Sequence, residues 1–164
     1  QALTTSLSQT PTVVYLDDFL LLGDSEEQLM EMVNRQVLAL ESHGLPVNVE
    51  KSTLSPVQEL EFQGYRLSFE GKNRGVFTTD KHLKDLSLLV KLIMAKKTVS
   101  LKTWQSFLGK YNWCRSRKED QEVHEELVAL MGERDRETGE ITIDHVARAM
   151  LSNMVTRCSL PFNF

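Results

Sequence analysis

The sequence has few of the residues that mark secreted or membrane proteins. Its two cysteines, Cys114 and Cys158, lie far apart and lack the CxxC spacing of a zinc site. Thiols without a disulfide framework fit a reducing compartment. No apolar run approaches the roughly 20 residues that a transmembrane helix needs, and the first residues, QALTTSLSQT, have no signal-peptide pattern. We therefore expect an intracellular protein without a membrane partner.

The chain also lacks an initiator Met, so we expect a fragment or a processed product of a longer protein. Its 164 residues suffice for one ordinary domain or two small ones, and 41% of them are hydrophobic. This composition supports a packed core and excludes wholesale disorder.

Acidic residues are absent from one long stretch. Between Leu86 and Lys118 there is no Asp or Glu, whereas Lys and Arg give this stretch a charge of +8. The rest of the chain carries −12, because the whole chain carries −4. The net charge argues weakly against a nucleic-acid binder, but such segregation matters more for the choice of partner than the sum does.

The first part of the chain mixes strand and helix patterns. Residues 13–22 (VVYLDDFLLL) predict a buried hairpin, because apolar runs flank an acidic pair. Residues 25–40 predict a helix that starts with the capping-box pattern SEEQ and has apolar residues at helical spacing. Gly44 and Pro46 end this helix, and we expect a short strand at residues 47–49.

The later part is mainly helical. Residues 60–69 predict a strand or a tight hairpin with Gly64 at its bend. Apolar stripes and caps then predict helices over residues 80–93, after Ser100, over 119–131 and over 145–156, with a turn and a short extended piece at 137–144 and the start of a strand at 160–164. The predicted fold class is α+β, with a hairpin, a helix and short strands followed by a mainly helical region.

The acidic pair Asp17 and Asp18 needs an explanation. Two adjacent carboxylates repel each other, and burying them without a partner is costly. Mg²⁺ resolves this, because it takes one or two carboxylates and completes its shell with water and phosphate oxygens. A pair of such ions can clamp a phosphoryl transfer. Asp is also a preferred turn residue, so the dipeptide by itself favours a simple polar turn.

The surrounding motifs favour the metal site. Residues 15–18 (YLDD) have the YxDD form and resemble the metal-binding motif of reverse transcriptases. Five further segments follow in the family's order. Residues 25–40 resemble the next palm helix, and residues 43–52 (HGLPVNVEKS) resemble the segment typically written xGLxLNxEKS. Residues 61–68 (EFQGYRLS) resemble the primer grip, residues 100–113 (SLKTWQSFLGKYNW) the thumb helix, and residues 141–164 the link to RNase H. The chain thus resembles the reverse transcriptases of gypsy-like LTR retrotransposons, or of the retroviral type, over nearly its whole length.

The resemblance implies roles for individual residues. Asp17 would bind the catalytic metals, two Mg²⁺ ions or Mn²⁺ in their place, and Asp18 would be a weaker or supporting ligand. Tyr15 would pack near the primer end. Lys51 would lie near the incoming deoxynucleoside triphosphate, where a cation offsets developing negative charge, although an ordinary solvated lysine explains it as well.

The resemblance also implies a primer grip and an RNA or DNA template–primer as partner. Phe62, Gly64 and Tyr65 would shape the grip, and a packed strand with a tight bend explains them equally well. Gln63 replaces the usual Leu of that motif. Contacts to nucleic-acid phosphates are expected from four cations on or just after the predicted thumb helix: Lys102, Lys110, Arg115 and Arg117.

The implied organisation has three parts: the C-terminal palm in residues 1–79, a helical thumb in 80–131, and a connection toward an RNase H-like domain in 132–164. The family's palm needs a further metal-binding aspartate and fingers, which residues 1–12 do not supply. We therefore expect the isolated chain to be inactive, within a polyprotein located in the cytoplasm, in virus-like particles, or in the nucleus. The alternative is a non-catalytic module that binds nucleic acid or protein.

Overall fold

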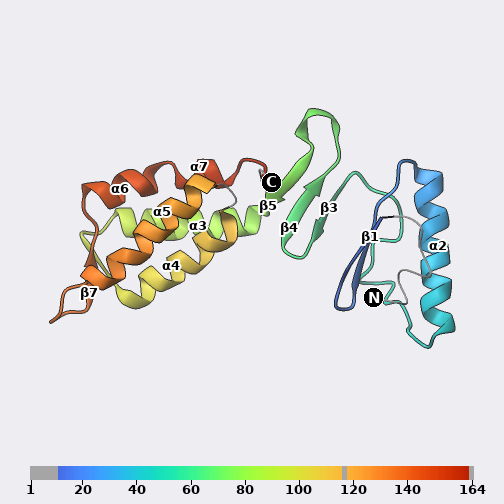
Figure 1. Ribbon diagram of the computed structural model, residues 1–164, viewed down its shortest axis with the longest axis horizontal. Helices are drawn as coiled ribbons and strands as arrows, with labels where there is room; N and C mark the ends of the chain where they lie inside the picture. The colour runs from blue at the N-terminus through green and yellow to red at the C-terminus, as the bar shows by residue number, and fades with distance from the viewer. Residues whose placement is uncertain (1–10, 116–117, 163–164) are drawn as a thin grey trace. The chain divides into compact units, whose positions relative to one another are not determined.

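The computed structural model describes residues 11–115 and 118–162, in which short strands and helices form two units, Gln1–Gln58 and Glu59–Phe164 (Figure 1). The mixture of small antiparallel sheets and helices confirms the predicted α+β class. No helix in these described ranges is both long and apolar enough to cross a bilayer. The predicted division into palm, thumb and connection stays a prediction.

The first unit contains an antiparallel hairpin and one helix. Strands β1 (Thr12–Tyr15) and β2 (Asp18–Leu21) pair over their whole length, and helix α2 (Glu26–Ser42) follows. The hairpin is present as predicted, but its expected burial is wrong, because most of β1 is exposed. The expected cap is present, because Ser25 Oγ accepts a hydrogen bond from the backbone N–H of Gln28 at 3.2 Å. Gly44, with a φ of 74°, ends the helix as expected.

The strand expected at residues 47–49 is wrong, because this segment forms a loop. The side chain of Asn48 accepts a hydrogen bond from the backbone N–H of Lys51 at 3.2 Å, and its carbonyl accepts one from the Ser52 hydroxyl at 2.6 Å. Such side-chain bonds bend the backbone into turns and compete with strand pairing. The apolar residues here therefore do not make a strand, and Val49 is 66% exposed.

The second unit begins with a three-stranded antiparallel sheet in the order β3-β4-β5. Its strands are β3 (Glu59–Phe62), β4 (Tyr65–Ser68) and β5 (Gly75–Thr78), with the short helix η1 (Gly71–Asn73) between the last two. The β3–β4 turn consists of Gln63 (φ 53°) and Gly64 (φ 79°). Both are left-handed, as a type I′ hairpin turn requires, so the predicted bend at Gly64 is confirmed.

Helices make up the rest of the second unit. They are α3 (Asp80–Met94), α4 (Leu101–Cys114), α5 (Lys118–Ala129), η2 (Leu130–Glu133), α6 (His145–Ser152) and α7 (Met154–Cys158). A two-stranded sheet of β6 (Thr98–Ser100) and β7 (Glu140–Thr142) joins distant segments. The predicted cap at Ser100 is confirmed, because its Oγ accepts a hydrogen bond from the N–H of Thr103 at 3.2 Å.

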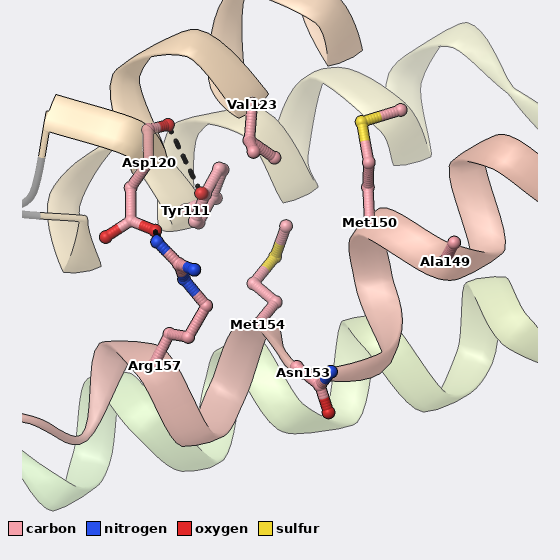
Figure 2. A pocket seen from close by; sticks show the side chains of 8 residues that line it. All are labelled: Tyr111, Asp120, Val123, Ala149, Met150, Asn153, Met154 and Arg157. Atoms are coloured by element: carbon pink, nitrogen blue, oxygen red, sulfur yellow. Dashed lines mark hydrogen bonds and ion pairs between the residues drawn. The ribbon is translucent and has the colours of Figure 1, made fainter.

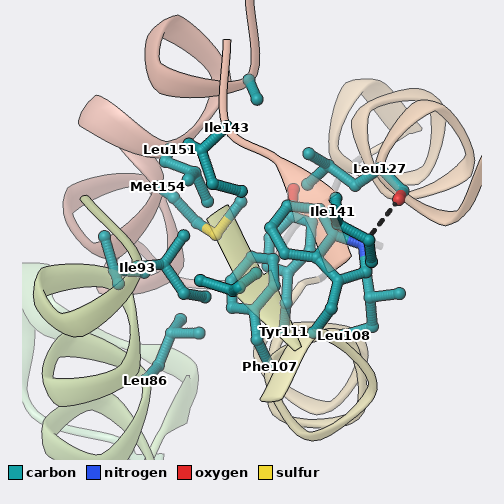
Figure 3. Packing of buried hydrophobic residues seen from close by; sticks show 14 of the residues in the cluster. Leu86, Ile93, Phe107, Leu108, Tyr111, Leu127, Ile141, Ile143, Leu151 and Met154 are labelled. Atoms are coloured by element: carbon teal, nitrogen blue, oxygen red, sulfur yellow. Dashed lines mark hydrogen bonds between the residues drawn. The ribbon is translucent and has the colours of Figure 1, made fainter. Parts of the chain in front are cut away.

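The hydrophobic core lies among these helices and β7 (Figure 3). The apolar stripe predicted on α4 is buried, and Trp104 and Phe107 are fully inaccessible. The Trp104 indole N–H donates to the carbonyl oxygen of Leu127 at 3.0 Å, which satisfies its one polar atom. The stripe on α3 faces the same core through Leu86 and Ile93.

Candidate functional site

The two aspartates lie at the tip of the β1–β2 hairpin. Tyr15 pairs with Asp18, so the connection between the strands consists of Leu16 and Asp17. Leu16 has a φ of 52° and is 82% exposed. A positive φ is uncommon for a residue that is neither Gly, Asn nor Asp, and it costs energy that the surrounding structure must supply. The YxDD motif therefore has a strained backbone at Leu16 in a tight two-residue turn.

The carboxylates fit a hard divalent cation by chemistry. Asp17 and Asp18 are both exposed, and each offers carboxylate oxygens of the kind that Mg²⁺ prefers. Within residues 11–115 and 118–162, no group of three His, Cys, Asp or Glu side chains is placed to hold a metal ion. The hairpin tip thus presents two adjacent carboxylates, and the described part of the chain brings no third potential ligand beside them.

The other predicted nucleotide-binding residues lie in the same unit. Tyr15 is 56% exposed at the end of β1. Lys51 is exposed in the loop that Asn48 organises. The structure thus brings Tyr15 together with the acidic pair on one hairpin and places Lys51 on a separate loop.

The hairpin predicted to be a primer grip belongs to the second unit. Phe62 and Tyr65 form the pair that flanks its turn. The ring of Tyr65 stacks on Trp113 of α4, with centroids 5.2 Å apart and planes 9° apart. Sequence reasoning assigned no contact to Trp113. The available signal was its place outside the apolar stripe of its helix, although its stacking partner could not be read from the sequence.

The predicted phosphate-binding cations lie on or after α4. Lys102 is exposed, and Lys110 pairs with Asp85 at 3.3 Å. Arg115 follows the helix and donates from Nε to the side-chain oxygen of Asn112 at 2.9 Å. The fourth predicted residue, Arg117, lies outside the described residues. The Lys110 and Asp85 side chains are 40% and 39% exposed, so solvent weakens their ion pair.

A pocket of about 200 Å³ lies among α4, α5, α6 and α7 (Figure 2). Polar residues contribute to its lining, and apolar side chains complete it: Tyr111, Asp120, Asn153 and Arg157 are the polar residues, and Val123, Ala149, Met150 and Met154 the apolar ones. Burial, followed by the nearby carboxylate of Asp120, raises the pKa of the Tyr111 hydroxyl above its ordinary value. The tyrosine is therefore a neutral hydrogen-bond donor at physiological pH, and its hydroxyl donates to the carbonyl oxygen of Asp120.

No family model matches the chain. Protein P of Duck hepatitis B virus (strain Germany/DHBV-3) is 28% identical over 102 residues, which are 62% of this chain and 12% of Protein P. Protein P of Heron hepatitis B virus matches to the same extent. The chain therefore spans about an eighth of the length of these curated relatives.

Two solved structures have a similar fold. The foamy viral protease-reverse transcriptase dRH in complex with double-stranded DNA superposes with a TM-score of 0.75 and 20% identity, over 99% of this chain and 26% of that one. A second foamy viral protease-reverse transcriptase, also in complex with double-stranded DNA, superposes with a TM-score of 0.70 and 20% identity. The match covers 99% of this chain and 32% of that one. The chain thus has a reverse-transcriptase-like fold.

Proposed function

We propose that the chain is the C-terminal palm and thumb region of an RNA-directed DNA polymerase from a gypsy-like LTR retroelement polyprotein. The complete enzyme adds deoxynucleotides to the 3′-hydroxyl of a primer. One observation carries this proposal: a YxDD sequence occupies a tight, exposed hairpin turn within a chain whose fold matches part of the foamy viral enzyme over 99% of its length.

The residues of the hairpin have distinct roles in this proposal. Asp17 and Asp18 hold divalent metal at the hairpin tip, with Mg²⁺ preferred over Mn²⁺. Metal bound there supplies charge neutralisation for the phosphate oxygens during transfer. Tyr15, beside the acidic pair, packs against the primer end, and the ammonium group of Lys51 offsets negative charge on the incoming triphosphate.

The second unit holds the template–primer. The β3–β4 turn, flanked by Phe62 and Tyr65, contacts the primer strand. The exposed Lys102 and the partly buried Arg115 contact phosphates, and such contacts are insensitive to base sequence. A polymerase needs this property, because it must hold any template.

A binding experiment with the chain as it stands tests the proposal. A fluorescently labelled RNA–DNA template–primer is titrated with the protein between 50 and 200 mM salt. The logarithm of the binding constant should fall linearly with the logarithm of salt concentration, and Lys102→Gln should reduce the slope by about 1. Glu122→Gln on α5 is the matched control, because it removes an exposed carboxylate instead of a cation. Binding without salt dependence would contradict the proposal.

The isolated chain should not extend a primer by itself, because the described residues group no third carboxylate with the acidic pair. Bound Mn²⁺, followed by electron paramagnetic resonance, should be lost in the Asp17→Asn and Asp18→Asn double variant. The Asp24→Asn variant is the control in the same unit. Equal Mn²⁺ binding by both variants would favour the alternative of a non-catalytic nucleic-acid-binding module. Primer extension that Asp17→Asn abolishes would overturn the expected inactivity.

A further inference from the structure

Trp113 lies at the end of α4 and outside the row of residues that face the core. Its side chain is 42% exposed, whereas Trp104, Phe107 and Tyr111 on the same helix are at most 2% exposed. Tryptophan has a large apolar surface that is usually buried. Packing of the helical core therefore does not account for this residue.

The turn of the β3–β4 hairpin lies directly against the indole ring. A Cβ atom added to Gly64 would lie 2.8 Å from Cζ2 of Trp113, and real Cβ atoms essentially never come so close to a neighbour. Gly64 also has a φ of 79°, which disfavours any other residue. Glycine is therefore favoured at this position for two independent reasons, the backbone conformation and the space that Trp113 occupies.

Two further rings extend this contact. Tyr65, the next residue after the turn, stacks on Trp113, and Phe162 meets Tyr65 edge-on with centroids 5.3 Å apart. The backbone N–H of Phe162 donates to the carbonyl oxygen of Val76 on β5 at 2.8 Å. His82 of α3 lies 5.4 Å from the Trp113 ring. Segments that are far apart in the sequence thus meet around one exposed indole.

We infer that Trp113 is a positioning residue for the β3–β4 turn. Its ring fixes the turn to the end of α4, so that the hairpin and the helix form one rigid element. The consequence for catalysis rests on the proposed function: the turn holds the primer at a constant distance from the cations of α4. A stacked aromatic pair of this geometry stabilises the folded state by more than its buried area accounts for. Such a contact is suited to hold the turn in a fixed position on α4.

A double-mutant cycle tests the inference without any nucleic acid. Amide hydrogen exchange is measured at residues 63–67 in the parent chain, Gly64→Ala, Trp113→Ala and the double variant. Gly139→Ala is the matched control, with exchange measured at its own turn. Gly139 has a φ of 70° and no atom within 4 Å of an added Cβ, so this variant shows the effect of backbone strain without a clash. Residues in contact give non-additive effects in such a cycle.

Gly64→Ala should accelerate exchange at the turn by about tenfold or more in the parent chain, and by clearly less in the Trp113→Ala background. In that background the clash has gone and backbone strain alone remains, as in Gly139→Ala. Equal acceleration in both backgrounds would overturn the inference. Exchange of the α4 core amides serves as the check that each variant is folded.

Replacement of the indole gives a second test. Trp113→Ala should accelerate exchange at the turn while the α4 core keeps its protection, and Trp113→Phe should restore most of the protection because it still stacks on Tyr65. Unchanged exchange in Trp113→Ala would also overturn the inference.

The template–primer assay separates this inference from the proposed function. Gly64→Ala should weaken binding several-fold without changing the salt slope, because it removes no cation. If the exchange results are as expected and the parent chain binds no template–primer, the positioning role stands and the proposed function fails.

Discussion

Arg157 of α7 binds the buried carboxylate of Asp120 on α5, with 2.8 Å between the nitrogen and oxygen atoms. The Asp120 side chain is 3% exposed, and that of Arg157 is 43% exposed. The backbone carbonyl of Asp120 also accepts a hydrogen bond from the Tyr111 hydroxyl at 3.2 Å (Figure 2). One residue of α5 is therefore joined to both α4 and α7 beside the core.

Arg157→Met should destabilise the second unit by about 2 kcal/mol, because it leaves a buried carboxylate without its charged partner while keeping much of the side-chain volume. The measurement is urea unfolding followed by circular dichroism. Arg35→Met is the matched control, since the Arg35–Glu31 pair lies on an exposed face of α2. That control should change stability by at most about 0.5 kcal/mol. Equal effects of the two variants would contradict the importance of the buried pair.

Ser100→Ala should cost about 1 kcal/mol, because Ser100 Oγ satisfies the N–H of Thr103 at the start of α4. Ser106→Ala, an exposed change in the middle of the same helix, should be neutral or slightly stabilising, because alanine is the better helix former. Thermal unfolding of the two variants gives the comparison. A loss of stability in Ser106→Ala as large as that in Ser100→Ala would mean that the cap contributes nothing specific.

Stability should depend on pH through His124. Burial, followed by the nearby Arg115 cation, lowers the pKa of its ring below the ordinary value of 6.5. Below pH 6.5 the unfolded chain therefore binds a proton that the folded chain does not, so the free energy of unfolding should decrease as pH falls from about 6.5. Its full value should be present above that pH.

His124→Gln should flatten the acid side of this curve, measured by urea unfolding at a series of pH values between 5 and 8. NMR titration of the His124 ring gives the pKa directly. A ring that titrates at or above the ordinary value in the folded chain would contradict the expected direction.

The two thiols should be unreactive in the folded protein. Burial raises the pKa of Cys114 to about 11 and that of Cys158 to about 12, and both residues are at most 2% exposed. The thiolate is the reactive form. Iodoacetamide at pH 8 should therefore label both residues at the rate of unfolding, and urea should accelerate labelling. Rapid labelling of the folded chain would contradict this environment.

Local features of the fold could be predicted from the sequence. The caps at Ser25 and Ser100 and the bend at Gly64 depend on a few neighbouring residues, and all three are present as expected. The prediction of the apolar stripe of α4 was also correct, because helical periodicity by itself defines the buried face of the helix.

Features that depend on distant partners were missed. Strand β5 exists because it pairs with β4, and no strand was expected there. The segment at residues 47–49 has apolar residues of the right kind, yet the side chain of Asn48 bends it into turns. Strand propensity depends strongly on what lies beside the strand, which a sequence pattern does not show.

The same division applies to the candidate site. The acidic pair, its flanking apolar runs and the basic stretch could be recognised from the sequence by itself. Each is a local pattern, because it is recognised without knowing which distant residues lie beside it. The tertiary structure decided that Trp113 meets Gly64 and Tyr65 and that Asp120 is held by Arg157. These contacts join residues far apart in the chain, so they depend on how the helices and the sheet pack and not on any local pattern.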